Sequence, residues 1–220
     1  MTDHRGGDAN SAREVLTSAM YRHFLPRMKL PDRVNILDLG AGNGGFPLLL
    51  QAHSLRLGKV ICLEFNPKTF VRLQFNLHRN LDADVTVQNA ALCGESKMLE
   101  IAIGDGGVSD NIFEENVGPN AVVHKIRGLS LDEIIESYFG NEAIDICKMD
   151  VEGAEFEVFA GGTYSRLTQC RYLIMEIHES KDRPVVKIIT ALKQMGFERQ
   201  SGETESDPWV HFFVNTFYKT

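Results

Sequence analysis

Short, continuous apolar runs alternate along this chain with stretches in which apolar residues recur every three or four positions. The runs are typical of strands buried on both faces of a parallel sheet, and they occupy 34–40, 59–65, 84–92, 144–150 and 171–178. The helical spacing falls between and after them, at 45–55, 67–80, from about 154, and at 184–196. Strands that alternate with helices predict an α/β fold, a three-layer sandwich around a mostly parallel sheet.

Several boundaries carry signals of their own. Pro67 opens one helix, and the capping box of Ser130 and Glu133 opens a short helix that ends near Phe139. The segment after Gly196 is typical of a final antiparallel hairpin, which brings the expected number of strands in the sheet to seven. An additional extended segment covers 97–104, and the Gly-, Asn- and Asp-rich residues 104–120 predict a long loop.

The length of 220 residues fits one domain, and no linker or repeat divides it. We expect residues 1–10 to be flexible, 11–24 to form a leading helix, and 11–220 to form a single domain. No apolar run approaches the roughly 20 residues of a membrane span. The N-terminus has no apolar signal-peptide region. These features predict a cytoplasmic protein without a membrane partner.

Charge and cysteine usage narrow the class of partner. The formal net charge of −7 disfavours a partner held through phosphates, so nucleic acid is not expected. The four cysteines are far apart and form no CxxC pair, and we expect buried thiols in a reducing compartment.

A glycine-rich segment, Asp38-Leu-Gly40-Ala41-Gly42-Asn43-Gly44-Gly45, follows the first strand. In parallel sheets, the loop at the carboxyl end of such a strand approaches a bound ligand closely. The spacing satisfies GxGxxG, and Glu64 ends the second strand, where an acid binds ribose hydroxyls. This layout fits NAD as well as S-adenosylmethionine (SAM).

Asp38 separates the two ligands. A carboxylate beneath the loop repels the pyrophosphate of NAD, whereas SAM has no phosphate and carries an ammonium and a sulfonium. The sequence therefore favours SAM. An NAD-dependent oxidoreductase remains an alternative, although the chain lacks a Tyr-x-x-x-Lys pair, and a non-catalytic module that binds SAM without turnover is another.

The end of the third strand and the residue after Glu64 are expected to complete the site. Asn89, followed by Ala90, is expected to offer its amide to N1 and N6 of adenine. Phe65 is expected to pack against the adenine ring.

The later strands are the most distinctive part of the chain. ICKMDVEGAEFEVFAGG and LIMEIHES, with DLGAGNGG, EFNP and LQFN, resemble the FkbM family of SAM-dependent methyltransferases over about residues 34–180. The resemblance implies a class I, Rossmann-like methyltransferase that methylates hydroxyls of sugars, polyketides or other small molecules. Family residues fall on Asp38, Glu64, Asp150, Glu176 and His178. The chain departs from the family at Gly42-Asn43 and at Phe65, where a proline is usual.

Methyl transfer from a sulfonium mainly requires alignment of the acceptor with the methyl carbon. Asp150 ends the fourth strand and His178 the fifth, so both are expected beside that methyl group. Either one is a candidate general base, and the other would position the acceptor or, for Asp150, the cofactor. A divalent cation held by Asp150, Glu152 and His178 is a further alternative, but their spacing is not a metal signature and no metal site is predicted.

Overall fold

The computed structural model describes residues 1–2, 15–16, 19–103, 121–200 and 209–218. The predicted flexible residues 1–10, the beginning of the predicted helix at 11–24 and the predicted loop at 104–120 lie largely or wholly outside these ranges. Where the leading helix was expected to end, residues Arg22–Arg27 form a 3-10 helix, η1.

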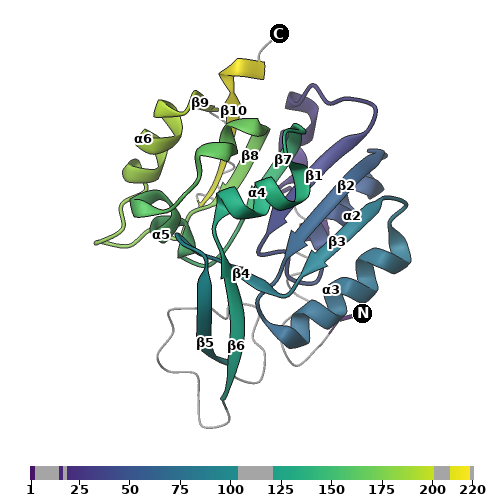
Figure 1. Ribbon diagram of the computed structural model, residues 1–220. Helices are drawn as coiled ribbons and strands as arrows, with labels where there is room; N and C mark the ends of the chain where they lie inside the picture. Colours follow the sequence, from purple (N-terminus) through teal and green to yellow (C-terminus); the bar gives the residue numbers. More distant parts are fainter. Residues whose placement is uncertain (3–14, 17–18, 104–120, 201–208, 219–220) are drawn as a thin grey trace.

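A seven-stranded sheet forms the centre of the molecule, in the order β3-β2-β1-β7-β8-β10-β9 (Figure 1). The first five strands of that order run parallel, whereas β10 is antiparallel to both β8 and β9. Their bounds are β1 Val34–Leu39, β2 Leu57–Leu63, β3 Asp84–Gln88, β7 Ile144–Met149, β8 Cys170–Glu176, β9 Phe197–Arg199 and β10 Val210–Asn215. The prediction of a mostly parallel seven-stranded sheet that ends in an antiparallel hairpin is confirmed.

The helices begin and end close to their sequence signals. They are α2 Gly45–Ala52, α3 Pro67–Asn80, α4 Leu131–Phe139, α5 Ala154–Gly161 and α6 Val186–Gln194, with 3-10 helices at η2 Ser165–Gln169 and η3 Thr216–Tyr218. Ser130 caps α4 through its side chain, which accepts a hydrogen bond of 3.3 Å from the amide of Glu133, as the capping box predicted.

Apolar side chains alternate between the two faces of the sheet, and each face has its own core. Leu37 and Leu39 of β1 pack with α4, α5 and α6, whereas Val34 and Ile36 pack with η1, α2 and α3. This division gives the three layers of the predicted sandwich. All four cysteines are buried thiols, as predicted. No helix within the described ranges is long and apolar enough to cross a membrane.

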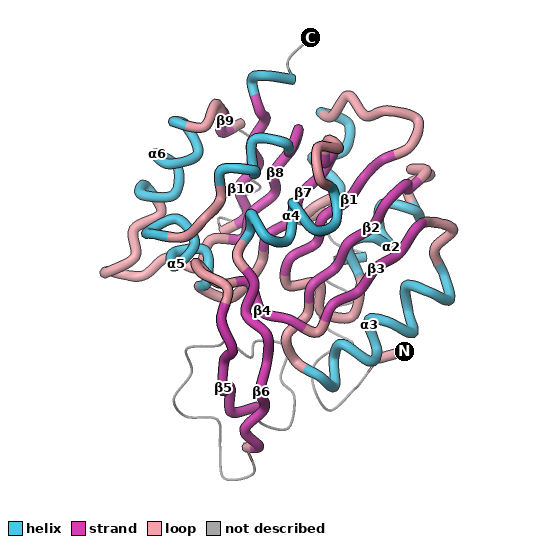
Figure 2. Tube along the Cα trace, in the orientation of Figure 1, coloured by secondary structure: helices cyan, strands magenta, loops and turns pink. Residues whose placement is uncertain are grey.

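A second, three-stranded sheet projects from the body below α5 and α3 (Figures 1 and 2). It contains β4 Ala90–Leu92, β6 Val122–Leu129 and β5 Lys97–Ile103, in that order. The predicted strand at 84–92 therefore divides at Asn89 between the two sheets. The predicted extended segment at 97–104 is confirmed as β5, but its partner β6 was not predicted, because its exposed residues give it no continuous apolar run.

Candidate active site

A cavity opens at the carboxyl ends of β1, β2 and β7, where the glycine loop leaves the sheet. Three segments with different chemistry share its wall. The backbone of Gly40–Asn43 forms one side, Glu64 and Phe65 form another, and Asp150 with Glu152 closes the third. Ala90, Ala91 and Leu92 of the second sheet add an apolar surface. The cavity therefore offers backbone amides, carboxylates and an apolar wall to one ligand.

Close packing explains why glycine occupies two positions of the loop. Gly40 has φ +74°, and a Cβ there would lie 1.7 Å from the carbonyl oxygen of Asp150. Gly44 has φ +89°, and its Cβ would lie 2.6 Å from the side chain of Leu77 in α3. Only glycine permits both the left-handed backbone and these approaches. The loop is thereby packed closely against Asp150, which follows β7, and against α3.

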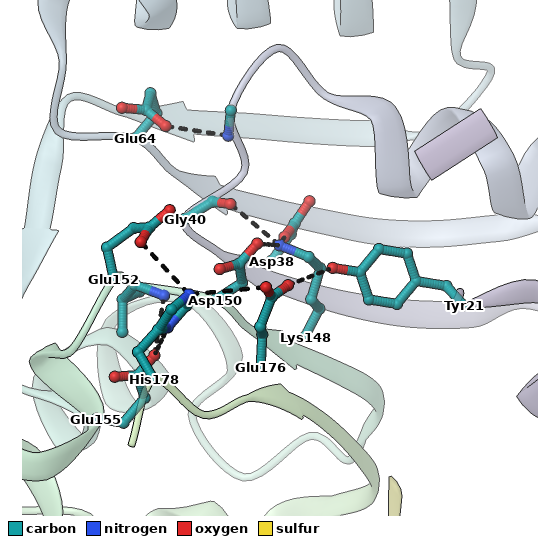
Figure 3. Close-up of polar contacts among 12 residues, drawn as sticks. Tyr21, Asp38, Gly40, Glu64, Lys148, Asp150, Glu152, Glu155, Glu176 and His178 are labelled. Atoms are coloured by element: carbon teal, nitrogen blue, oxygen red, sulfur yellow. Dashed lines mark hydrogen bonds and ion pairs between the residues drawn. The ribbon is translucent and has the colours of Figure 1, made fainter. Parts of the chain in front are cut away.

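Glu64 is almost fully buried beside the loop (Figure 3). Its Oε2 accepts a hydrogen bond of 3.0 Å from the amide of Gly42, and its Oε1 accepts one of 2.8 Å from the amide of Asn66. Burial raises the pKa of Glu64 to about 7, although both amides act in the opposite direction. The carboxylate thus lies at the cavity wall, where the sequence placed the ribose-binding acid.

Asp38 is fully buried beneath the loop, and its partner was not predicted. The Nζ of Lys148, in β7, lies 3.6 Å from Asp38 Oδ1 and donates to the carbonyl of Gly40 at 3.1 Å and to Asp150 Oδ2 at 3.2 Å. Burial raises the pKa of Asp38 to about 6, although Lys148 lowers it. The carboxylate expected to meet the cofactor ammonium is therefore paired with a lysine under the loop.

The sequence did contain a signal for Lys148, namely a lysine inside the apolar run IDICKMD. A lysine in a strand buried on both faces requires negative partners. Here the partners are Asp38 and Asp150.

Asn89 and Phe65 shape the cavity wall. The Asn89 side-chain amide donates to the backbone carbonyls of Glu64 at 2.9 Å and Phe65 at 2.8 Å. These hydrogen bonds hold the end of β2, and Ala90, the next residue, lines the cavity. A contact between the Asn89 amide and adenine stays a prediction. Phe65 lines the cavity as well and packs against the core of the second sheet.

The ends of β7 and β8 bring Asp150 and His178 together, as expected from their strand-end positions, and add Glu176 (Figure 3). One ligand-type atom from each of the three residues lies within 4.8 Å of the others. The His178 Nε2 is 3.6 Å from Glu176 Oε1 and 3.4 Å from Glu152 Oε2. His178 Nδ1 lies 3.4 Å from Oε1 of the fully buried Glu155.

Carboxylates around His178 and Glu176 change the ionisation of both. The hydrogen bond to Glu155 is the main reason that the pKa of His178 rises to about 9, against the effect of burial. Burial, followed by the charge of Asp150, raises the pKa of Glu176. At neutral pH the imidazole of His178 is therefore protonated, and its nitrogens donate hydrogen bonds.

Comparison with known proteins gives a consistent result. The family model described as the FkbM methyltransferase domain matches residues 38–199. The AMB antimetabolite synthetase AmbE of Pseudomonas aeruginosa is 31% identical in an alignment that covers 77% of this chain and 10% of that protein. This chain is thus similar to a tenth of the length of that curated relative.

Two solved structures resemble the fold. Methyltransferase FkbM from Methylobacillus flagellatus KT superposes with a TM-score of 0.59 at 15% identity, over 85% of this chain and 44% of that one. Magnesium protoporphyrin IX methyltransferase from Synechocystis PCC 6803, solved with bound SAM, gives a TM-score of 0.51 at 14% identity, over 96% of this chain and 83% of that one. The architecture of the described residues is that of a class I methyltransferase.

Proposed function

Because the chain belongs to the FkbM methyltransferase family, we propose that it transfers a methyl group from SAM to a hydroxyl group of a small molecule. The observation that carries the proposal is the cavity at the ends of β1, β2 and β7. Its lining joins the glycine loop and Glu64 to Asp150, which belongs to the cluster at the ends of β7 and β8. The residues that we propose for the cofactor thus adjoin those that we propose for the acceptor.

The residues of the cavity fit SAM, which when bound supplies a methyl group on a positively charged sulfur. Glu64 would accept hydrogen bonds from the ribose hydroxyls, and Phe65 and Leu92 would contact the adenine. A Cβ at Gly42 would have no heavy atom within 4 Å, so the backbone there is open to a ligand. The carboxylates of Asp150 and Glu152 favour a cationic sulfur over a pyrophosphate.

Asp150 and His178 would hold the acceptor hydroxyl, Asp150 by accepting a hydrogen bond from it and the protonated imidazole by donating one to its oxygen. Asp150 lines the cofactor cavity, and His178 stands beside it at the end of the neighbouring strand. Lys148 fixes one oxygen of Asp150, and Glu155 fixes Nδ1 of His178, so both side chains are positioned by buried partners. Such positioning is what in-line methyl transfer requires.

Titration calorimetry with SAM, S-adenosylhomocysteine and NAD tests the cofactor. We expect both sulfur ligands to bind in the micromolar range and Glu64→Gln to weaken them about tenfold, the effect of about 1.4 kcal/mol. The exposed Glu100→Gln is the matched control. Binding of NAD alone would support the oxidoreductase alternative, and binding of none of the three would reject a cofactor site.

Turnover tests the acceptor class. S-adenosylhomocysteine release is measured with a panel of hydroxylated small molecules and, separately, with RNA. We expect a small-molecule acceptor, and with that acceptor His178→Ala should lower kcat by about 100-fold, because the hydroxyl loses one of the groups that align it. Unchanged kcat in His178→Ala would remove this residue from the mechanism, and turnover on RNA alone would reject the small-molecule proposal. Turnover on neither, despite SAM binding, would favour the non-catalytic module.

A further inference from the structure

We propose that Asp150, Glu176 and His178 form a binding site for one divalent cation, Mg²⁺ or Mn²⁺, beside the cofactor cavity. One ligand atom from each residue lies within 4.8 Å of the others. With bonds of about 2 Å, two ligands of an octahedral Mg²⁺ are about 4 Å apart when they are opposite and about 3 Å apart when they are adjacent. The three atoms must therefore approach one another by up to about 2 Å to bind one ion, a distance within the reach of side-chain rotation.

Both carboxylate ligands are held through one oxygen each. Lys148 Nζ donates to Asp150 Oδ2 at 3.2 Å, and the hydroxyl of Tyr21 lies 3.5 Å from Glu176 Oε2 and can donate to it. The second oxygen of Glu176, Oε1, faces His178 Nε2 at 3.6 Å. The contact with Tyr21 thus leaves Oε1 of Glu176 facing His178, and Lys148 holds Asp150 beside them, as residues behind metal ligands commonly orient them.

The imidazole is held in the same way, by a buried carboxylate. Glu155 Oε1 accepts from His178 Nδ1 at 3.4 Å, which turns Nε2 toward the two carboxylate ligands. The Glu155 side chain is fully buried, and among the described residues its Oε2 has no hydrogen-bond partner. A buried carboxylate behind a histidine, with the second ring nitrogen facing other ligands, is the arrangement found at metal-bound histidines.

Carboxyl groups outnumber cationic side chains around the cluster. Two carboxyl groups lie within about 4 Å of Lys148, those of Asp38 and Asp150 (Figure 3). Three more lie close to His178, those of Glu152, Glu155 and Glu176. Lys148 provides one positive charge, and a protonated His178 would provide a second. Buried charge of one sign is costly unless it is compensated. A divalent cation bound at the cluster would add two positive charges beside these carboxyl groups. It would take the place of the proton on His178 Nε2.

The site leaves coordination positions open. The side chains of Asp150, Glu176 and His178 are 24%, 20% and 31% exposed, respectively, so water or an acceptor hydroxyl can reach an ion held by them. An ion there would lower the pKa of a bound hydroxyl, whose proton would leave to water. The acceptor oxygen would then bond to the methyl carbon as the carbon–sulfur bond breaks. This role rests on the proposed methyl transfer, whereas the cation site itself does not.

Direct Mn²⁺ binding tests the site without SAM or an acceptor. The full chain, stripped with EDTA and desalted, is titrated with Mn²⁺ while electron paramagnetic resonance measures the free ion. We expect one specifically bound Mn²⁺ per chain that Mg²⁺ displaces. Glu176→Gln and His178→Ala should each weaken it by about tenfold or more. Glu100→Gln and His53→Ala make the same two substitutions at exposed residues and serve as controls. Both should bind Mn²⁺ like the unchanged chain.

Mn²⁺ binding by the unchanged chain tests the inference even if the variants do not fold. Absence of binding above the weak level of surface carboxylates would overturn it, as would equal binding by Glu176→Gln and His178→Ala. Calorimetry in EDTA separates the two proposals. SAM binding without Mn²⁺ binding would overturn the cation site and leave the proposed function intact. Mn²⁺ binding that depends on His178, without SAM binding, would support the site and reject the function.

Discussion

Ionisable side chains at the ends of the central strands are buried, and each has a different kind of partner. Glu64 accepts two backbone amides, whereas Asp38 lies against the ammonium of Lys148. Burial lowers the pKa of Lys148, but the charges of Asp150, Tyr21 and Asp38 outweigh it, so the pKa is raised. The floor of the cavity therefore retains a buried cation that neutralises Asp38, while Glu64 remains the acid at the wall.

Glu64 makes the stability of the protein without cofactor depend on pH. Its folded pKa of about 7 lies above the usual value of 4.5. The stability that it contributes is therefore present below pH 4.5 and is lost as the pH rises through about 7. Glu64→Gln removes this titration. We expect the variant to lose less unfolding free energy than the unchanged chain between about pH 5 and pH 8, with a difference on the order of 3 kcal/mol at most.

Urea unfolding at the two pH values measures this difference. Every other titrating group is shared by the two proteins, so the comparison isolates Glu64. An equal loss of unfolding free energy in both would contradict the raised pKa.

Among the contacts between elements, the one between the glycine loop and the end of β7 is expected to matter most for stability. We expect Gly40→Ala to prevent folding or to cost at least about 3 kcal/mol, because its Cβ would overlap the Asp150 carbonyl and its backbone is left-handed. Gly161→Ala, at the end of α5, meets no atom within 4 Å and should stay within about 1 kcal/mol of the unchanged chain. Thermal and urea unfolding of both variants measure the effect, and similar stabilities would contradict the packing described.

Elements that local sequence signals mark were predicted correctly. Elements that depend on pairing with a strand distant in the sequence were not. Pro67 and Ser130 each mark a helix start correctly, because capping is a local interaction. Strand β6 and the division of the third strand at Asn89 were not predicted. Strand β6 pairs with β5 and β4, which are distant from it in the sequence. Because many of its side chains are exposed, it has no continuous apolar run that would predict a strand.

In the part of the chain that the structure describes, helices cover both faces of the seven-stranded sheet. That residues 11–220 form a single domain stays a prediction. We expect one cooperative unfolding transition, with far-UV circular dichroism and the fluorescence of Trp209, the single tryptophan, changing together in urea. Two separated transitions would show that the projecting sheet, or another part, unfolds independently.

The sequence alone determined the layers, the glycine loop and the acids at the ends of the strands. Parallel strands carry continuous apolar runs, and their carboxyl ends meet at one edge, so residues such as Glu64, Asp150 and His178 could be placed without coordinates. Only the tertiary structure decided which side chains touch. Asp38 pairs with Lys148, 110 residues away by their numbers, and Glu176 joins Asp150 and His178 in the cluster. Such contacts depend on strand order and side-chain direction across elements, and no local pattern records either.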